Sequence, residues 1–142
     1  MNTYDIHLDL KYKPLEVCDA GKIADNCGKD WWNQSLVNVN ESVIRVGVFL
    51  GEFHWHKHDR EDEFFWVIDG LLLLDLETEE GDPFGSHKLK PGESPKPGKF
   101  RTVELSPRQG LMVPKGVVHR TRAKVRTTVL MVEPATVKPT GD

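Results

Sequence analysis

The sequence lacks the segments that would carry a protein into or across a membrane. Its longest apolar runs, VIRVGVFL and FFWVIDGLLLL, are far shorter than the roughly 20 residues that a membrane-spanning helix needs. The N-terminus MNTYDIHLDLKYK lacks the basic head, the apolar middle and the small-residue cleavage site of a secretory signal. We therefore expect a soluble, cytoplasmic protein with no membrane partner.

A basic surface and a cysteine framework are also missing. The 142 residues include 19 Lys and Arg against 22 Asp and Glu, so the net charge is −3. Proteins that bind nucleic acid usually carry a positive patch, so a nucleic-acid partner is not expected. Cys18 and Cys27 are the only cysteines, and their spacing fits no CxxC metal or redox motif. Without an export signal we expect two reduced thiols with structural roles.

What the sequence does contain, from Leu36 onward, is a series of short segments typical of β-strands. They are rich in β-branched and aromatic residues and are separated by turn residues such as the Asp69–Gly70 pair, which suits a tight hairpin. This pattern predicts an antiparallel sandwich or barrel. The segments are SVIRVGVFL, EFHWHKH, EFFWVI, LLLLDLE, RTVELS, GLMVPKG, VVHRTRA and TTVLMVE.

The rest of the chain is less regular. PLEVCDAGKIAD (14–25) is the candidate for a short helix, and the Pro/Gly-rich residues 81–99 are predicted to form a loop. His87, within that loop, is expected to be exposed, with a lid role as the alternative. The length fits one domain with a core of its own. Its predicted parts are an N-terminal arm (1–35), a barrel (36–135) and a tail (136–142).

Three histidines, His54, His56 and His58, alternate just ahead of an acidic stretch. Along a strand, side chains two residues apart lie on the same face, roughly 6.5–7 Å apart, so two imidazoles can converge on one metal ion. On a helix the same spacing would point them in different directions. Glu63 follows His58 after four residues, and His119 follows a Pro-x-Gly turn far downstream. The pattern indicates a metal site built from separate strands.

These residues form two motifs that resemble those of the cupin family. The first family motif is His-x-His, three or four residues, Glu, six residues and Gly. The second is Pro-x-Gly, two residues and His. Both occur here in the same order, and the matching residues are His56, His58, Glu63, Gly70 and His119.

The resemblance covers about residues 36 to 133. It is closest to the small single-domain bacterial cupins of the cupin type-2 family, which are often labelled mannose-6-phosphate-isomerase-like. It implies an all-β fold, the cupin-type double-stranded β-helix or jelly-roll barrel. It also implies a centre for one divalent transition metal ion (Fe, Mn, Ni, Co or Zn). An ion that prefers six ligands would keep two open coordination positions. The implied ligands are His56, His58, Glu63 and His119.

The choice of histidine pair decides the role of His54. Only His56 and His58 satisfy both motif spacings, because pairing His54 with His56 would leave six residues before Glu63. His54 would then face the same interior and is the candidate catalytic base; the alternative is an imidazole with no role. Both tyrosines of the chain lie outside the motifs, so no motif tyrosine competes for this function.

The resemblance implies an enzyme that acts on a small organic molecule in the mouth of the barrel. One form is an Fe(II) dioxygenase, and the other is a sugar-type isomerase in which the metal polarises a carbonyl. The alternative from a different class is a non-catalytic sensing or storage protein with a structural metal. Reachable coordination positions and a general base beside them would separate these classes.

Several residues are expected to face away from the barrel interior. Phe64, Trp66 and Ile68 alternate with the inward-facing residues of their strand, and an exposed apolar face of this kind indicates a homodimer. The two tryptophans of the N-terminal arm are expected on the barrel exterior or against the partner chain. Thr121 shares the inward face with the preceding ligand, so Arg120 and Arg122 are expected to form a solvated outer face.

Overall fold

The computed structural model describes residues 4–77 and 100–142. The predicted loop 81–99 and His87 lie outside the described residues. The elements in chain order are β1 (Asp5–His7), α1 (Ala20–Asn26), β2 (Trp31–Val39), β3 (Ser42–Glu52), β4 (Glu63–Asp69), β5 (Leu72–Leu76), β6 (Arg101–Leu105), β7 (Gly110–Val113) and β8 (His119–Pro134).

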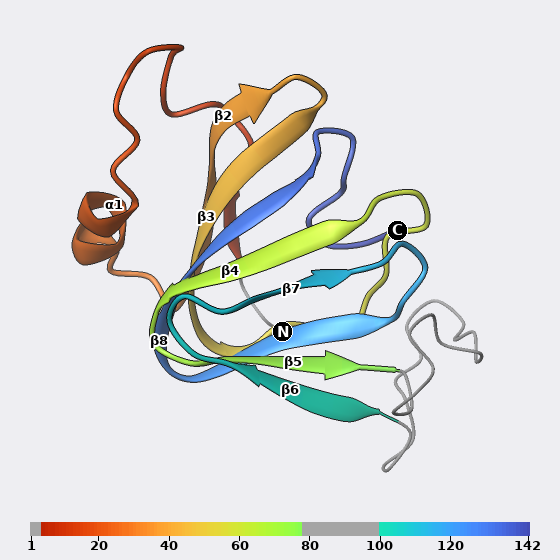
Figure 1. The fold of residues 1–142 in the computed structure, drawn as a ribbon. Helices are drawn as coiled ribbons and strands as arrows, with labels where there is room; N and C mark the ends of the chain where they lie inside the picture. The colour runs from red at the N-terminus through yellow and green to blue at the C-terminus, as the bar shows by residue number, and fades with distance from the viewer. Residues whose placement is uncertain (1–3, 78–99) are drawn as a thin grey trace.

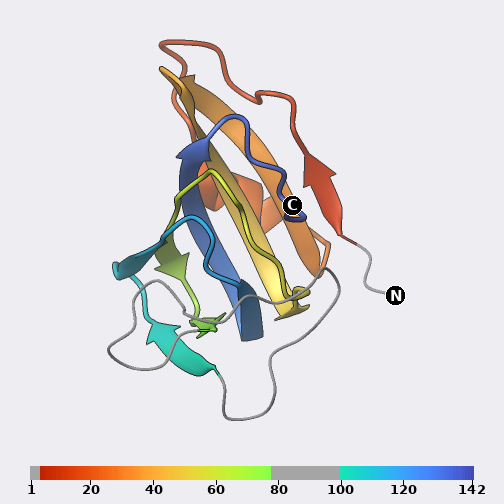
Figure 2. The ribbon, with the colours of Figure 1, turned by 90° about the vertical axis from the view of Figure 1, so that its right-hand side faces the viewer.

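The strands form one curled sheet in the order β1-β2-β3-β8-β4-β7, with β5 pairing to β8 and β6 to β5 (Figure 1). Every pairing is antiparallel except the parallel pair β1–β2. The 16-residue β8 pairs with β5 near its start and with β3 and β4 further on. It therefore connects β3 and β4 with the β5–β6 pair in the curled sheet, which Figure 2 shows from the side. The predicted all-β jelly-roll fold is confirmed.

Alternation along β4 is as predicted. Phe65 and Val67 are 2% and 0% exposed and belong to the interior core, whereas Trp66 is exposed on the outer face. A shift of this strand by one residue would exchange its buried and exposed faces. Such a shift is disfavoured, because burying a large apolar side chain stabilises the fold by roughly 1.5–3 kcal/mol. The same alternation brings Glu63 to the interior at the start of the strand.

The helix is shorter than predicted. The candidate segment was 14–25, but α1 begins at Ala20, after Asp19 has capped it by accepting a hydrogen bond from the Lys22 amide at 2.9 Å. Leu15 has a φ of 72°, and a residue in the left-handed region cannot continue a right-handed helix. In the described part of the chain, no helix has the length and the apolar character needed to span a membrane.

Trp31 lies inside the barrel, which corrects the expectation that it would pack on the exterior. The sheet extends into the predicted N-terminal arm, because β2 begins at this residue. Trp31 is 5% exposed, and its ring stacks on Phe49 with 4.3 Å between centroids. Trp32, on the opposite face, is only half-buried and lies against His7. Strand alternation thus gives the two neighbouring tryptophans different roles.

Arg120 and Arg122 are not the solvated outer face that was expected. Both point away from the interior, but they converge on Asp75, whose side chain is fully buried. Their Nε atoms lie 2.7 and 2.6 Å from its Oδ2. Burial by itself would raise the pKa of Asp75, but hydrogen bonds from Arg122, Thr102 and Arg120 hold that pKa below its ordinary value. The arginines are the counter-ions of a buried carboxylate.

Candidate metal centre

The predicted ligands come from three places that the sheet brings together. Glu63 begins β4 and His119 begins β8. His56 and His58 lie between β3 and β4, in a segment predicted as a strand (52–58). Only its first residue, Glu52, belongs to a strand, and His56 pairs with His119 through an isolated bridge. Two backbone hydrogen bonds of 3.0 and 2.8 Å form that bridge, and the Gly116 amide donates to the His58 carbonyl at 2.8 Å.

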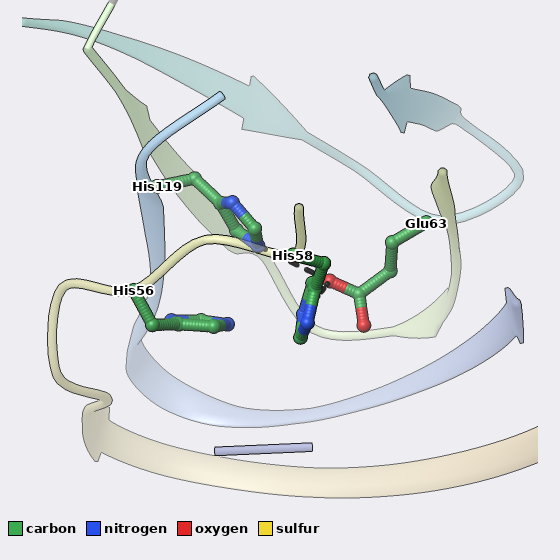
Figure 3. A group of neighbouring side chains, drawn as sticks. All are labelled: His56, His58, Glu63 and His119. Carbon is green, nitrogen blue, oxygen red and sulfur yellow. Dashed lines mark hydrogen bonds and ion pairs between the residues drawn. The ribbon is translucent and has the colours of Figure 1, made fainter. Parts of the chain in front are cut away.

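The four side chains point at a common centre (Figure 3). One donor atom from each lies within 4.8 Å of the others. Glu63 Oε1 is 3.1 Å from His119 Nε2 and 3.6 Å from His58 Nε2. Neighbouring ligands of an ion with bonds of about 2.1 Å are separated by about 3.0–3.4 Å. The spacing of 3.1 Å falls in this range, and that of 3.6 Å is slightly longer. The structure brings all four predicted ligands together.

Backbone carbonyls orient two of the imidazoles. His56 Nδ1 lies 2.9 Å from the His54 carbonyl oxygen, and His119 Nδ1 lies 2.9 Å from the Val117 carbonyl oxygen. A carbonyl only accepts, so each Nδ1 carries a hydrogen, and each Nε2 is the ring atom left to bind an ion at the centre. Such support fixes the ring orientation of metal-binding histidines.

His58 gives an independent test of fit. It is 2% exposed, and neither ring nitrogen has a hydrogen-bond partner among the described residues. An unpartnered buried polar group costs free energy. A divalent cation at the centre would satisfy this ring, so the donor set fits a metal.

The electrostatics favour the ligand protonation states. Burial, together with the nearby charge of His119, lowers the pKa of His56 well below its usual range. Burial by itself would raise the pKa of Glu63, but hydrogen bonding to Glu133 and His119 outweighs it, and the pKa lies well below the ordinary value. A neutral imidazole and an ionised carboxylate are the forms that bind a cation.

Sequence reasoning missed a group of polar residues beside the centre: Asn33, Arg45 and Glu133. Burial and the negative charge of Glu63 raise the pKa of Glu133 to about 10. Arg45 is 1% exposed although it lies in the apolar run VIRVGVFL. Strand alternation could have indicated that Arg45 and Glu133 face the interior, because Arg45 shares its face of β3 with the core residue Phe49 and Glu133 shares its face of β8 with His119.

A small cavity of about 30 Å³ lies beside the centre, room for one or two water molecules. Thr121 lines it, as the alternation predicted. Its walls combine aromatic side chains with the polar group just described. The lining residues are Trp31, Asn33, Arg45, Phe49, Phe53, His56, Glu63, Phe65, Thr121, Met131, Glu133 and Pro139.

His54 is placed differently from the four converging residues and does not line this cavity. Its Nε2 lies 2.6 Å from the Thr140 carbonyl oxygen, so it donates there, and its Nδ1 lies 3.3 Å from the Tyr4 hydroxyl. His54 therefore links the N-terminal and C-terminal segments beside His56, where Gly141 also packs. No sequence motif revealed these contacts. A catalytic role for His54 stays a prediction.

Comparison with known proteins now identifies the relatives. No protein-family model matches the sequence. The uncharacterized protein YdbB of Bacillus subtilis is 36% identical over 111 residues, which are 78% of this chain and 80% of YdbB. This chain belongs to the same family as YdbB. Its relationship to YdbB covers most of both chains, but the name of that relative carries no activity.

Solved structures give the fold of this YdbB relative as that of the cupins. A cupin-2 domain protein from Shewanella frigidimarina matches with a TM-score of 0.64 and 21% identity, over 83% of this chain and 94% of that one. A cupin superfamily protein from Desulfitobacterium hafniense has a TM-score of 0.59 and 15% identity, over 89% and 97%. Hydroquinone 1,2-dioxygenase from Sphingomonas, with 4-hydroxybenzoate bound, has a TM-score of 0.59 and 18% identity, over 94% and 89%. The mannose-6-phosphate-isomerase-like subtype has no support among these matches.

Proposed function

We propose that this protein is a metal-dependent enzyme that acts on a small organic molecule, with His56, His58, Glu63 and His119 as the metal ligands. The observation that carries the proposal is the convergence of four donor atoms within 4.8 Å. Holding three imidazoles, two of them buried, so close to a buried carboxylate is costly unless a cation compensates them. The cavity beside them offers space that a core built only for stability would fill.

The chemistry follows from the donor set. A six-coordinate Fe(II), Mn(II), Ni(II) or Co(II) held by these four side chains would keep two positions for substrate or oxygen and supply Lewis acidity or a redox couple; Zn(II) would keep fewer. The protein itself supplies orientation and a dry environment. Trp31, Phe49 and Phe53 form an aromatic wall beside the centre that excludes water and suits an apolar substrate body.

Of the two reactions, dioxygenation has more support than sugar isomerisation. An isomerase moves a proton and needs a base beside its substrate, but both ring nitrogens of His54 are engaged by Tyr4 and Thr140. A dioxygenase places both atoms of O₂ in one substrate, and so needs no separate reductant. The Sphingomonas neighbour, named as a hydroquinone dioxygenase, is consistent with this choice.

The proposal is tested by metal analysis followed by oxygen uptake. Protein purified without added metal should contain about one divalent transition ion per chain, as the four-donor set implies. The Fe(II) form should then consume one O₂ per substrate molecule with a member of a panel of organic molecules small enough for the cavity of about 30 Å³. His119→Ala should abolish uptake, whereas His7→Ala, which changes a half-buried histidine outside the centre, should not.

Each failure has its own meaning. Chains that take up no divalent ion would contradict the metal centre. Chains that hold the ion but consume no oxygen with any substrate would favour the non-catalytic sensing or storage protein. Isomerisation of a sugar substrate by the loaded protein, with a loss of turnover in His54→Gln that exceeds any loss of metal, would favour the isomerase and restore the base role of His54.

We also propose that the chain forms a homodimer through the outer face of β4, β7 and β8. Trp66, Met112 and Val132 are 38%, 48% and 36% exposed. Phe64 lies between Met112 and Val132 in the strand register, so these side chains form a continuous apolar row. A second copy offers the same row, and isologous contact of identical apolar surfaces is the commonest way to cover such a face.

The dimer is tested by mass in solution. Wild-type protein should show twice the chain mass by light scattering, and Trp66→Glu should shift it to the monomer because a charge would be buried at the contact. Leu15→Glu, at an exposed apolar residue in the N-terminal segment, should leave the mass unchanged. A wild-type mass that stays monomeric as concentration rises would contradict the proposal.

A further inference from the structure

A row of polar side chains crosses the interior from the candidate metal centre to the far wall. It begins at Glu63 on β4 and continues through Glu133 on β8 and Arg45 on β3 to Asn33 on β2. These strands are consecutive neighbours in the sheet. All four residues line the cavity and are at least 95% buried, since Asn33 and Glu63 are 5%, Glu133 is 3% and Arg45 is 1% exposed.

Arg45 is only partly satisfied by its neighbours. Its Nη1 lies 3.5 Å from Glu133 Oε1, a long contact for an ion pair, and its Nη2 donates to Asn33 Oδ1. Its Nε has no hydrogen-bond partner among the described residues. Guanidinium carries five N–H donors in a planar fork that matches a carboxylate. Arg45 therefore lines the cavity while part of its hydrogen-bonding capacity, at the buried Nε, is unused by the described residues.

The charges at the cavity favour an anion once the centre holds its metal. A divalent ion and Arg45 bring three positive charges, and the imidazoles are neutral when they act as ligands. Glu63 and Glu133 bring at most two negative charges, and both line this space. The loaded cavity therefore carries an excess of at least one positive charge, which is costly in a buried site unless an anion enters.

We propose that the ligand of this cavity is a small monocarboxylate whose carboxylate pairs with Arg45, making Arg45 the residue that determines specificity. This inference rests on the proposed metal centre. The single negative charge of the carboxylate balances the excess positive charge of the loaded cavity, and its two coplanar oxygens match the planar N–H donors of the Arg45 guanidinium. The aromatic wall of Trp31, Phe49 and Phe53 then contacts the apolar remainder, and the narrow space limits that remainder to a few atoms.

The test uses the Co(II)-loaded protein, with acetate as the probe and acetamide as the neutral probe of the same shape. Binding is followed by the Co(II) absorption spectrum and by calorimetry. Acetate should bind the wild type at least tenfold more tightly than acetamide or phosphate. Arg45→Met should weaken acetate binding roughly ten- to a hundredfold, the usual effect of losing a charge-assisted hydrogen bond. Arg126→Met, at an exposed arginine outside the cavity, should leave it unchanged.

A second variant keeps the test informative if Arg45→Met folds poorly. The double variant Arg45→Met with Glu133→Gln leaves no unpaired charge, should fold, and should show the same loss of acetate binding. Equal acetate affinity in the wild type and the double variant would overturn the inference. It would also be overturned if acetate did not bind the wild type, or if phosphate bound as tightly as acetate. Measuring the metal content distinguishes failure of this inference from failure of the metal centre, because chains that take up no Co(II) would refute both.

Discussion

Replacing His58 with alanine is expected to weaken binding of the divalent ion more than about a hundredfold, because losing even an outer supporting group of a metal site costs roughly 10–100-fold. His58 is buried, and its ring nitrogens have no other partner among the described residues. Its removal takes away one of four donors and leaves the other three unable to close around the ion. Metal content after dialysis against a chelator, and titration with a competing indicator, measure the effect.

His54→Ala is the matched control, because it removes the neighbouring histidine of the alternating series. Its ring contacts Tyr4 and the Thr140 carbonyl rather than the centre. The affinity for the metal ion should therefore fall by less than about tenfold, the smallest loss usually seen when a group that supports a metal ligand is removed. His58→Gln keeps a polar side chain and guards against misfolding of the alanine variant. Equal losses in the His54 and His58 variants would mean that the wrong pair of histidines has been assigned.

Removing the metal at neutral pH is expected to lower the melting temperature by roughly 10–20 °C. A ligand present at a thousandfold its dissociation constant stabilises the native state by about 4 kcal/mol, and each kcal/mol shifts the midpoint of a domain of this size by about 3–5 °C. Calorimetry of the loaded protein with and without a chelator measures the difference. His58→Ala should show no such difference, since it holds little metal in either condition.

The difference in melting temperature between the metal-loaded and the metal-free protein should disappear as the solution becomes acidic. Protons compete with the ion for imidazoles whose unperturbed pKa is about 6.5, so the loaded form loses metal below about pH 6. The metal-free form also loses stability there, because the lowered pKa of His56 means that the unfolded chain binds a proton that the folded chain does not. That loss starts near pH 6.5 and grows as the pH falls. An unchanged difference at about pH 5 would contradict imidazole ligation.

Strand alternation showed that two of the three histidines could converge on one ion, because every second residue of an extended segment shares a face. The choice of His56 and His58, with Glu63 beside them, came from the resemblance to the cupin motifs. Alternation also placed Phe65 and Val67 in the core and Trp66 outside. It failed for most of the strand expected at 52–58, because β3 ends at Glu52 and the histidines beyond it pair through a bridge between His56 and His119.

The sequence by itself thus determined the all-β barrel and the four converging side chains. Only the tertiary structure decided the surroundings of that centre. Arg45 and Glu133 are 88 residues apart and meet because β3 pairs with β8 in one register. His54 reaches Tyr4 and Thr140 across 50 and 86 residues. Strand order and register arise from the packing of the whole chain, and no local periodicity encodes them.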